Sequence, residues 1–475
     1  WADYFWKKEV VGGKVFKQSI WSRVGDQADE YNEPGVFTAF IGYEWTSLAF
    51  NLHRVVIFKD GAEQTKKVLP FSQFDSKKPE DLWQYFSRYE KETGGEVLAI
   101  PHNGNLSAGH MFGLKDSNGK TLSRDYAQNR SRWEPLYEVT QIKGDSEAHP
   151  FLSPDDIFSD YETWYPFLEV KPENTRRQYE YARSALKLGL GQQHKLGVNT
   201  FKFGMVGGSD AHGGISAVEE DNFVGKGYWM EPNPDRIKSP AYGGMNRRAI
   251  PGWQLNAAGY TGIWARENTR ESLFAAMKRK EVYASTGPRM TVRFFGGWDY
   301  QSDDAFSSEL AQIGYQKGVP MGGDLSNAPE NKAPQFLIRA VKDPDGANLD
   351  RVQVIKGWHD AKGELHEKIY NVALSDNRKP NWRGKVKPVD NTVDIKNARY
   401  TNTIGDPELA TVWTDPDFNK DELAFYYVRV LEIPTPRWTA YDAKFFQLKD
   451  IPKEVPMVTQ ERAYTSPIWY SPETH

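Results

Sequence analysis

The sequence contains no cysteine in 475 residues. The lack of thiols excludes disulfide bonds, thiolate zinc sites and cysteine nucleophiles together. Any metal ion bound by the chain must therefore be held by nitrogen and oxygen ligands. A cysteine-free chain suits an oxidising compartment as well as the cytosol, so this absence alone does not locate the protein.

Long apolar segments and a surplus of basic residues are also missing. No apolar run reaches the ~18 residues that a membrane-spanning helix needs. The formal net charge is −4, which gives no overall positive field to attract nucleic acid or an anionic membrane. We therefore expect neither a membrane span nor a nucleic-acid partner.

Two familiar signatures of catalysis are absent as well. The chain has no glycine-rich nucleotide fingerprint or P-loop, and it has no Gly-x-Ser-x-Gly elbow. Without a thiol or a serine elbow, a metal-activated water is the remaining economical nucleophile. Two or more metal ions would lower the pKa of that water and neutralise charge that grows on a phosphoryl or acyl oxygen.

The first two-thirds of the chain alternates between strand-like and helix-like segments. Apolar runs predict strands near 36–45 and 53–58 and a strand that ends at Pro101, and helical spacing predicts helices over 79–94, 175–188 and 269–280. Repeated strand–helix–strand units indicate parallel pairing, and right-handed crossovers then favour a barrel or an open wound sheet. Of these two we expect an α/β barrel.

Beyond residue 288 the pattern changes to short β-rich segments separated by turn signals. The predicted strands are 335–341, 351–355, 368–374 and 424–431. This pattern favours a β-sandwich-like C-terminal domain. We therefore expect two domains, an α/β barrel over 1–290 and a β-rich domain over 291–475.

Three short motifs place unusual side chains directly after apolar runs. Glu44, His102 and the pair Asp210-x-His212 follow the runs 36–41, 97–100 and 203–206. In α/β folds, sites are built at the edge where buried parallel strands end. A carboxylate, an imidazole and an Asp-x-His pair at one such edge are suitable ligands for a divalent metal ion.

The sequence alone does not assign two of the possible ligands, Glu44 and His53, to a metal site. Glu44 would be costly to bury unpaired, and either a metal ion or an arginine would neutralise it. His53 begins a predicted strand instead of ending one, so spacing alone does not assign it to the same site.

Three further residues are candidates for handling a substrate. His149 lies in a loop beside Asp145 and Glu147, where it could bind substrate, transfer a proton or stay solvated. Arg54, next to His53, and Arg289, at the end of the last α/β unit, could bind an anionic oxygen. A structural salt bridge explains Arg289 equally well.

At these motifs the sequence resembles the DUF3604 family, which is related to the polymerase and histidinol phosphatase (PHP) metal-dependent hydrolases. The segments that carry the resemblance are 40–47, 51–54, 101–103, 144–150, 208–212, 285–289, 426–430 and 461–470. The resemblance therefore covers nearly the whole chain.

The PHP-like resemblance implies a distorted TIM-like barrel with a cluster of two or three divalent metal ions, commonly zinc, manganese or iron. By this analogy Glu44 would bridge metal ions, His53 and His102 would be terminal ligands, and Asp210 and His212 would complete the cluster. The implied function is that of a metal-dependent phosphoesterase, in which a metal-bound hydroxide attacks a small, anionic ester substrate.

The sequence departs from this pattern at one point. PHP relatives begin the barrel with a His-x-His strand and an Asp-His element, and this sequence has neither. Because the sequence begins with Trp1, we expect these elements upstream of it. The alternatives are a PHP-like binding or structural protein with impaired catalysis, and a hydrolase of another ester or amide. Many relatives are exported, which predicts a periplasmic location over a cytoplasmic one. The number of subunits stays open.

Overall fold

A computed structural model describes residues 13–47, 50–164, 176–242, 249–382 and 385–472. The chain divides into two compact units that are interleaved along the sequence. The first unit comprises 1–138, 171–203 and 263–281, and the second comprises 139–170, 204–262 and 282–475. The border that we predicted at residue 290 falls inside the last segment of the second unit.

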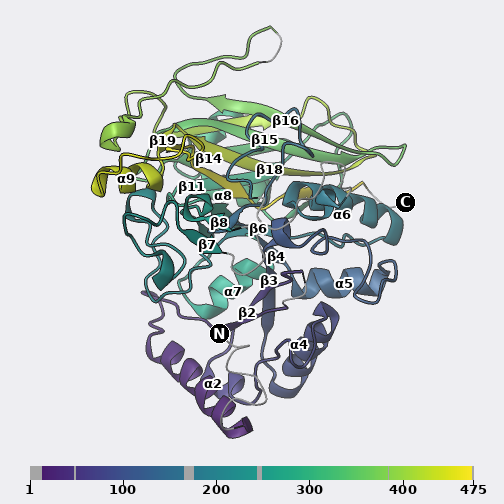
Figure 1. Cartoon of the computed structure of the whole chain (residues 1–475). Helices are drawn as coiled ribbons and strands as arrows, with labels where there is room; N and C mark the ends of the chain where they lie inside the picture. The colour runs from purple at the N-terminus through teal and green to yellow at the C-terminus, as the bar shows by residue number, and fades with distance from the viewer. Residues whose placement is uncertain (1–12, 48–49, 165–175, 243–248, 383–384, 473–475) are drawn as a thin grey trace. The chain divides into compact units, whose positions relative to one another are not determined.

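A three-stranded sheet with the order β1-β2-β3 forms the centre of the first unit (Figure 1). Its strands are β1 (Ile41–Trp45), β2 (Arg54–Phe58) and β3 (Val97–Pro101). Apolar side chains of these strands join a buried aromatic core with the neighbouring helices. Burial of this apolar surface is the main stabilising contribution to the sheet.

The parallel pairing that we predicted for these strands is wrong, because β2 pairs antiparallel with both β1 and β3. Residues 46–53 join β1 to β2 and are fewer than the dozen or so residues that a parallel crossover needs. Between β2 and β3 the chain passes through two helices, yet Phe58 pairs with Val97. The chain therefore returns to the end of the sheet that it left.

The helices of the first unit begin and end at local signals. They are α2 (Gly13–Glu30), α3 (Ala62–Thr65), α4 (Pro79–Thr93), α5 (Arg124–Trp133), α6 (Ala182–Leu196) and α7 (Arg270–Lys278). Proline occupies the first turn of α4, and Gly94 ends it with a left-handed φ of 71°. The Thr269 hydroxyl caps α7.

The helix that we predicted over 175–188 differs most from the structure. Residue 175 lies outside the described residues, and α6 begins only at Ala182. The helix continues to Leu196 and ends at Gly197, whose φ is 70°. Gly189 and Gly191 lie inside α6 and weaken the helical signal of its second half, which explains why the end was predicted too early.

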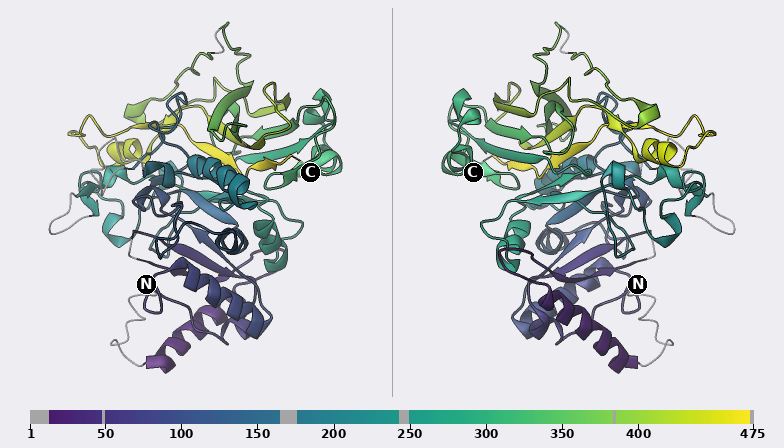
Figure 2. Two further views of the ribbon diagram at one scale, coloured as in Figure 1. Left: turned by 90° about the vertical axis from the view of Figure 1, so that its right-hand side faces the viewer. Right: turned by 90° about the vertical axis from the view of Figure 1, so that its left-hand side faces the viewer.

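The second unit contains most of the strands, and Figure 2 shows those beyond residue 290 in green to yellow. An eight-stranded sheet has the order β13-β22-β18-β21-β10-β9, in which β15 also pairs with β18 and β16 pairs with β15. Its strands are β9 (Tyr260–Ile263), β10 (Val282–Ser285), β13 (Asp324–Leu325), β15 (Leu349–His359), β16 (Leu365–Leu374), β18 (Leu423–Glu432), β21 (Arg462–Thr465) and β22 (Ile468–Tyr470).

A four-stranded sheet with the order β12-β11-β14-β17 completes this β-rich region. Its strands are β11 (Thr291–Gly297), β12 (Gly318–Pro320), β14 (Gln335–Val341) and β17 (Glu408–Thr414). The ring centroids of Phe336 in β14 and Tyr426 in β18 lie 4.5 Å apart. The two sheets therefore contact each other through buried aromatic side chains. All four strands predicted beyond residue 288 are present.

The described residues form several small sheets and no closed barrel, in contrast to the TIM-like barrel that we predicted. Antiparallel pairing around β2 is one physical reason, because a TIM-like barrel closes with parallel strands. The remaining sheets are formed by β4 (Leu136–Gln141), β5 (Gly144–Asp145) and β6 (Gly204–Gly207), by β7 (Pro240–Tyr242) and β8 (Ile250–Pro251), and by β19 (Thr435–Pro436) and β20 (Val458–Thr459). The protein is a mixed α/β molecule.

Within the described part of the chain, no helix combines the length and the apolar character that crossing a bilayer requires.

Candidate metal centre

Three predicted metal ligands meet at one edge of the β1-β2-β3 sheet. Glu44 is near the end of β1, His53 directly precedes β2, and His102 directly follows β3. Because β2 runs antiparallel between its neighbours, its start lies at the edge where β1 and β3 end. The antiparallel arrangement thus explains why a residue that begins a strand joins two residues at strand ends.

Donor atoms of the three side chains converge closely. His53 Nδ1 lies 2.7 Å from Glu44 Oε1, and His102 Nε2 lies 3.3 Å from the same oxygen. The centroids of the two imidazole rings are 5.5 Å apart. One donor atom from each of the three residues lies within 4.8 Å of the others. This spacing allows a single cation to contact all three residues.

Local backbone conformation places the two histidines. Asn51 and Asn103 have left-handed φ values of 50° and 65° and turn the chain just before His53 and just after His102. Asparagine adopts this conformation more readily than most residues. The Asn51 side chain also donates to the Leu106 carbonyl at 3.1 Å, and the His102 N–H donates to the His53 carbonyl at 3.3 Å. These bonds join the two loops that carry the imidazoles.

Burial and charge differ among the three ligands. The His102 side chain is 3% exposed, whereas Glu44 is 34% exposed, so Glu44 faces the accessible side of the cluster. Burial alone would raise the pKa of Glu44, but hydrogen bonds and charge from His102 and His53 hold that pKa well below its ordinary value. Glu44 is therefore ionised at neutral pH, as a metal ligand must be.

The donor set fits a divalent metal ion. Two imidazoles and one carboxylate are a known set of protein ligands for catalytic zinc, and iron also accepts this combination. His102 Nδ1 is buried and has no hydrogen-bond partner among the described residues. In metal sites the second ring nitrogen of a ligating histidine usually donates to a protein group or a water.

A basic cavity of about 740 Å³ lies in the first unit. Leu52, the neighbour of His53, is part of its wall, and so are five side chains that carry or can carry positive charge, namely Lys77, Lys78, His110, Lys115 and Arg176. These residues are spread over a hundred positions and form no motif, so no sequence pattern identifies them. Such a cavity is suited to an anionic ligand.

Asp210 and His212 form a separate group in the second unit. Asp210 has a left-handed φ of 50°, and its Oδ1 lies 3.3 Å from His212 Nε2 and 2.7 Å from Lys226 Nζ. Lys143 forms a further ion pair with its Oδ2. Two ammonium groups thus neutralise this carboxylate. A shared centre with Glu44, His53 and His102 stays a prediction, because the two groups belong to different units.

The three residues predicted to handle substrate have different environments. Arg54 is buried, and its Nε donates to Glu134 at 3.0 Å, which is a structural ion pair. His149 is also buried, and its Nδ1 accepts the Phe151 N–H at 3.0 Å. Arg289 is 72% exposed, and its Nη2 lies 3.4 Å from Glu219. Catalytic roles for these residues stay predictions.

The fold and the cluster together define a mixed α/β protein with a candidate metal centre. A family model described as "Protein of unknown function (DUF3604)" matches residues 4–472. Because this match spans nearly the whole chain, the protein belongs to the DUF3604 family, as its motifs predicted. A comparison with curated proteins finds no match. The relation to PHP hydrolases stays a prediction.

Proposed function

We propose that this DUF3604 protein is a metal-dependent hydrolase that binds a divalent ion through Glu44, His53 and His102. The observation that carries the proposal is the convergence of these three donors within 4.8 Å at one sheet edge. Their sequence positions are far apart, and only the pairing of β1, β2 and β3 brings them together.

The residues of the cluster have distinct tasks in this proposal. A bound divalent ion would supply Lewis-acid polarisation and would lower the pKa of a water ligand. Glu44 supplies negative charge and contacts both imidazoles through one oxygen, which fixes the orientation of the rings. His102 is held by burial, and His53 and Glu44 leave the accessible side of the cluster open.

The proposed substrate is a small phosphoester. The basic cavity whose wall includes Leu52 supports an anionic substrate, because its lysines and Arg176 can neutralise phosphate charge. Asp210 and His212 remain proposed ligands of a second or third ion, which would have to displace the ammonium groups of Lys143 and Lys226 from Asp210. The proposed location is periplasmic, by resemblance to exported relatives.

Metal analysis and a substrate panel test this function. The protein would be reconstituted with zinc, manganese or iron, and its metal content and its hydrolysis of phosphate mono-, di- and triesters would be measured beside carboxyl and sulfate esters. We expect stoichiometric metal and phosphoester cleavage that chelation abolishes. Failure to retain any metal after reconstitution would refute the proposal, and metal binding without hydrolysis would favour the catalytically impaired alternative.

Variants separate this centre from incidental metal binding. His53→Ala and Glu44→Gln are expected to lower metal affinity by about 100-fold or more, because each removes a direct donor. His194→Ala, at an exposed position of α6 in the same unit, is the matched control and should bind metal like the wild type. Equal metal content in all three variants would assign the metal to another site.

A further inference from the structure

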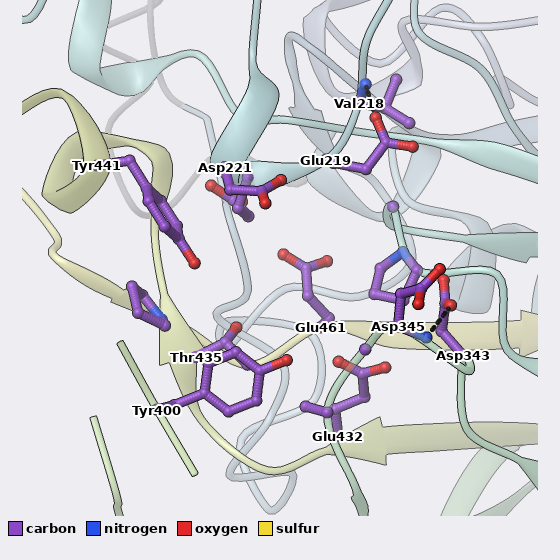
Figure 3. A pocket seen from close by; sticks show the side chains of 16 residues that line it. Val218, Glu219, Asp221, Asp343, Asp345, Tyr400, Glu432, Thr435, Tyr441 and Glu461 are labelled. Carbon is purple, nitrogen blue, oxygen red and sulfur yellow. Dashed lines mark hydrogen bonds between the residues drawn. The ribbon is translucent and has the colours of Figure 1, made fainter. Parts of the chain in front are cut away.

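A second cavity of about 290 Å³ lies wholly within the second unit and is lined by acidic side chains. Figure 3 shows their carboxyl groups around the cavity together with the phenol groups of Tyr400 and Tyr441. The acidic residues of its wall are Glu219, Glu220, Asp221, Asp343, Asp345, Glu432 and Glu461. None of them belongs to the candidate metal centre.

Two of these carboxylates lie opposite each other on neighbouring strands. Glu432 is the last residue of β18, and Glu461 directly precedes β21. Leu431 pairs with Arg462, and the Glu432 N–H donates to the Glu461 carbonyl at 2.9 Å, so the two glutamates are cross-strand neighbours. Like charges in this position destabilise a sheet. Their side chains are only 1% and 3% exposed, which increases the penalty.

The carboxyl groups of Glu432 and Glu461 lie in the wall of the cavity (Figure 3), and each has one enclosed oxygen without a hydrogen-bond partner among the described residues. The Oε1 atoms of Glu432 and Glu461 are enclosed and accept no hydrogen bond from the described residues. The other oxygen of Glu461 accepts from the hydroxyls of Thr286 and Tyr161. Glu220 faces Glu461, and these two carboxyl groups bond to each other only when they share a proton. An external donor would satisfy these oxygens.

Arg289 pairs with Glu219, a residue of the cavity wall. Lys342 and Arg437, whose charges oppose the rise that burial causes in the pKa values of Glu432 and Glu220, bind to other groups. Lys342 Nζ donates to the backbone carbonyls of Asp343, Pro344 and Gly346 at 2.7, 3.0 and 3.0 Å. The Arg437 guanidinium makes a bidentate ion pair with Glu162, at 2.7 and 2.9 Å. Neither side chain therefore donates to the enclosed oxygens of Glu432 and Glu461.

The pKa values of Glu432 and Glu461 are raised, as expected for buried carboxyl groups that lie near one another. Burial, followed by the charges of Glu461 and Asp343, raises the pKa of Glu432 well above its ordinary value. Burial also raises the pKa of Glu461 to about 7, against the hydrogen bonds that lower it. Ionisation of the carboxyl groups in this cavity is thus unfavourable unless a positively charged group lies beside them.

We propose that the cavity binds a small organic cation, a primary amine or short polyamine, whose ammonium group donates to Glu432 and Glu461. Within the described residues, the groups of three donor atoms within 4.8 Å of one another are Glu44–His53–His102 and Asp360–Glu364–His366, so the cavity's oxygens do not form such a compact metal cluster. The rings of Tyr400 and Tyr441 and the prolines Pro288 and Pro436 provide walls for an alkyl chain and a cation–π partner.

Isothermal titration calorimetry with the full chain at pH 8 tests the proposal. The probes are 1,5-diaminopentane and spermidine, with 1,5-pentanediol as the uncharged analogue and calcium chloride as the inorganic cation. We expect binding of at least one amine and no binding of the diol. Absence of amine binding, equal binding of the diol, or binding of calcium in place of the amines would each overturn the proposal.

Single substitutions locate the binding site. Glu461→Gln and Glu432→Gln should each weaken amine binding by about tenfold or more, because each replaces a charged acceptor by a neutral one. Glutamine at 461 can still accept from Thr286 and Tyr161, and circular dichroism would verify folding. Glu364→Gln removes an exposed carboxylate outside the cavity and is the matched control. Wild-type affinity in both cavity variants would refute the assignment.

If either glutamine variant fails to fold, Tyr441→Phe provides a second measurement. This change removes a hydroxyl from the wall of the cavity and keeps the aromatic ring. We expect amine binding to persist with altered affinity in this variant, whereas unchanged affinity in Tyr441→Phe and Tyr400→Phe together would place the amine outside the cavity.

Discussion

At the scale of single residues, the partly exposed Glu44 and the buried Glu461 have opposite electrostatic environments. Two imidazoles surround Glu44 and hold its pKa low in spite of burial. Glu461 faces other carboxyl groups, and burial raises its pKa to about 7. The same side chain is thus an ionised ligand in one place and a proton-binding group in the other, because the neighbouring charges differ.

The raised pKa of Glu461 predicts a pH-dependent difference in stability. The folded protein keeps this proton up to about pH 7, whereas the unfolded chain releases it near the ordinary value of 4.5. Between these values the folded state binds more protons, so the contribution of Glu461 to the free energy of unfolding decreases as pH rises. We expect Glu461→Gln to gain on the order of 1–3 kcal/mol relative to wild type between pH 4.5 and 7.5.

Urea denaturation of both proteins across this pH range measures the effect. Glu364→Gln, which changes an exposed carboxyl group, should follow the wild-type curve. Parallel pH profiles for wild type and Glu461→Gln would show that Glu461 does not titrate in this window.

At the scale of elements, the close approach of β1 and β2 determines the position of Glu44. A Cβ atom at Gly42 would lie 2.5 Å from the Val56 carbonyl oxygen, which is closer than any normal contact. Glycine at this position allows β2 to lie against β1 and to present His53 beside Glu44. The geometry of the candidate metal centre thus depends on a residue that carries no ligand.

Gly42→Ala is therefore expected to destabilise the protein by about 1–3 kcal/mol through overpacking. It should also lower metal affinity, because β1 would move and Glu44 lies two residues further along it. Thermal unfolding and metal titration measure the two effects. Gly214→Ala is the control, since a Cβ there meets open space. Wild-type stability and metal affinity in Gly42→Ala would contradict this account.

The local sequence predicted the positions of helices and strands well, but it predicted the direction of strand pairing poorly. Pro79 and Gly94 mark the ends of α4, and Thr269 caps α7, because these signals act within one turn of helix. The direction of pairing around β2 depends on where the chain returns after α4, which no local pattern contains. His53 illustrates the consequence, because spacing alone left it unassigned and antiparallel pairing explains its place.

For the acidic cavity too, local sequence indicates single residues but does not indicate which strands pair. Glu432 ends an apolar strand in the same way as Glu44, so the criterion that identified Glu44 would also have identified Glu432. Its opposition to Glu461 depends on the register that pairs Leu431 with Arg462. That register is a property of the folded sheet, and no local sequence pattern specifies it.

At the scale of the whole molecule, the second unit is built from distant parts of the chain. Tyr283 in β10 pairs with Thr465 in β21, and the Met205 N–H donates to Ser466 Oγ at 3.1 Å. Arg429 binds Asp156 at 2.7 Å in the buried interior. Residues within 139–164 and 204–242, such as Asp156 and Met205, therefore bind partners that lie beyond residue 290.

A fragment of residues 1–290 tests this interdependence. We expect it to lack cooperative unfolding of the 139–170 and 204–262 segments and to expose apolar surface, because strands such as β10 lose their partners. Near-ultraviolet circular dichroism and binding of a hydrophobic dye measure both properties, with the full chain as the control. A fragment that melts cooperatively with native-like aromatic signals would support an independent domain that ends at residue 290.

The pairing of β10 with β21 also imposes an order on biosynthesis. Residues 286–461 separate these strands, so the ribosome completes β10 on the order of 10–35 s before it delivers β21. During that interval the nascent polypeptide carries a strand edge whose eventual neighbour has not been translated. The synthesis of β21 thus covers this edge of β10, and premature termination anywhere before β21 would leave the edge permanently uncovered.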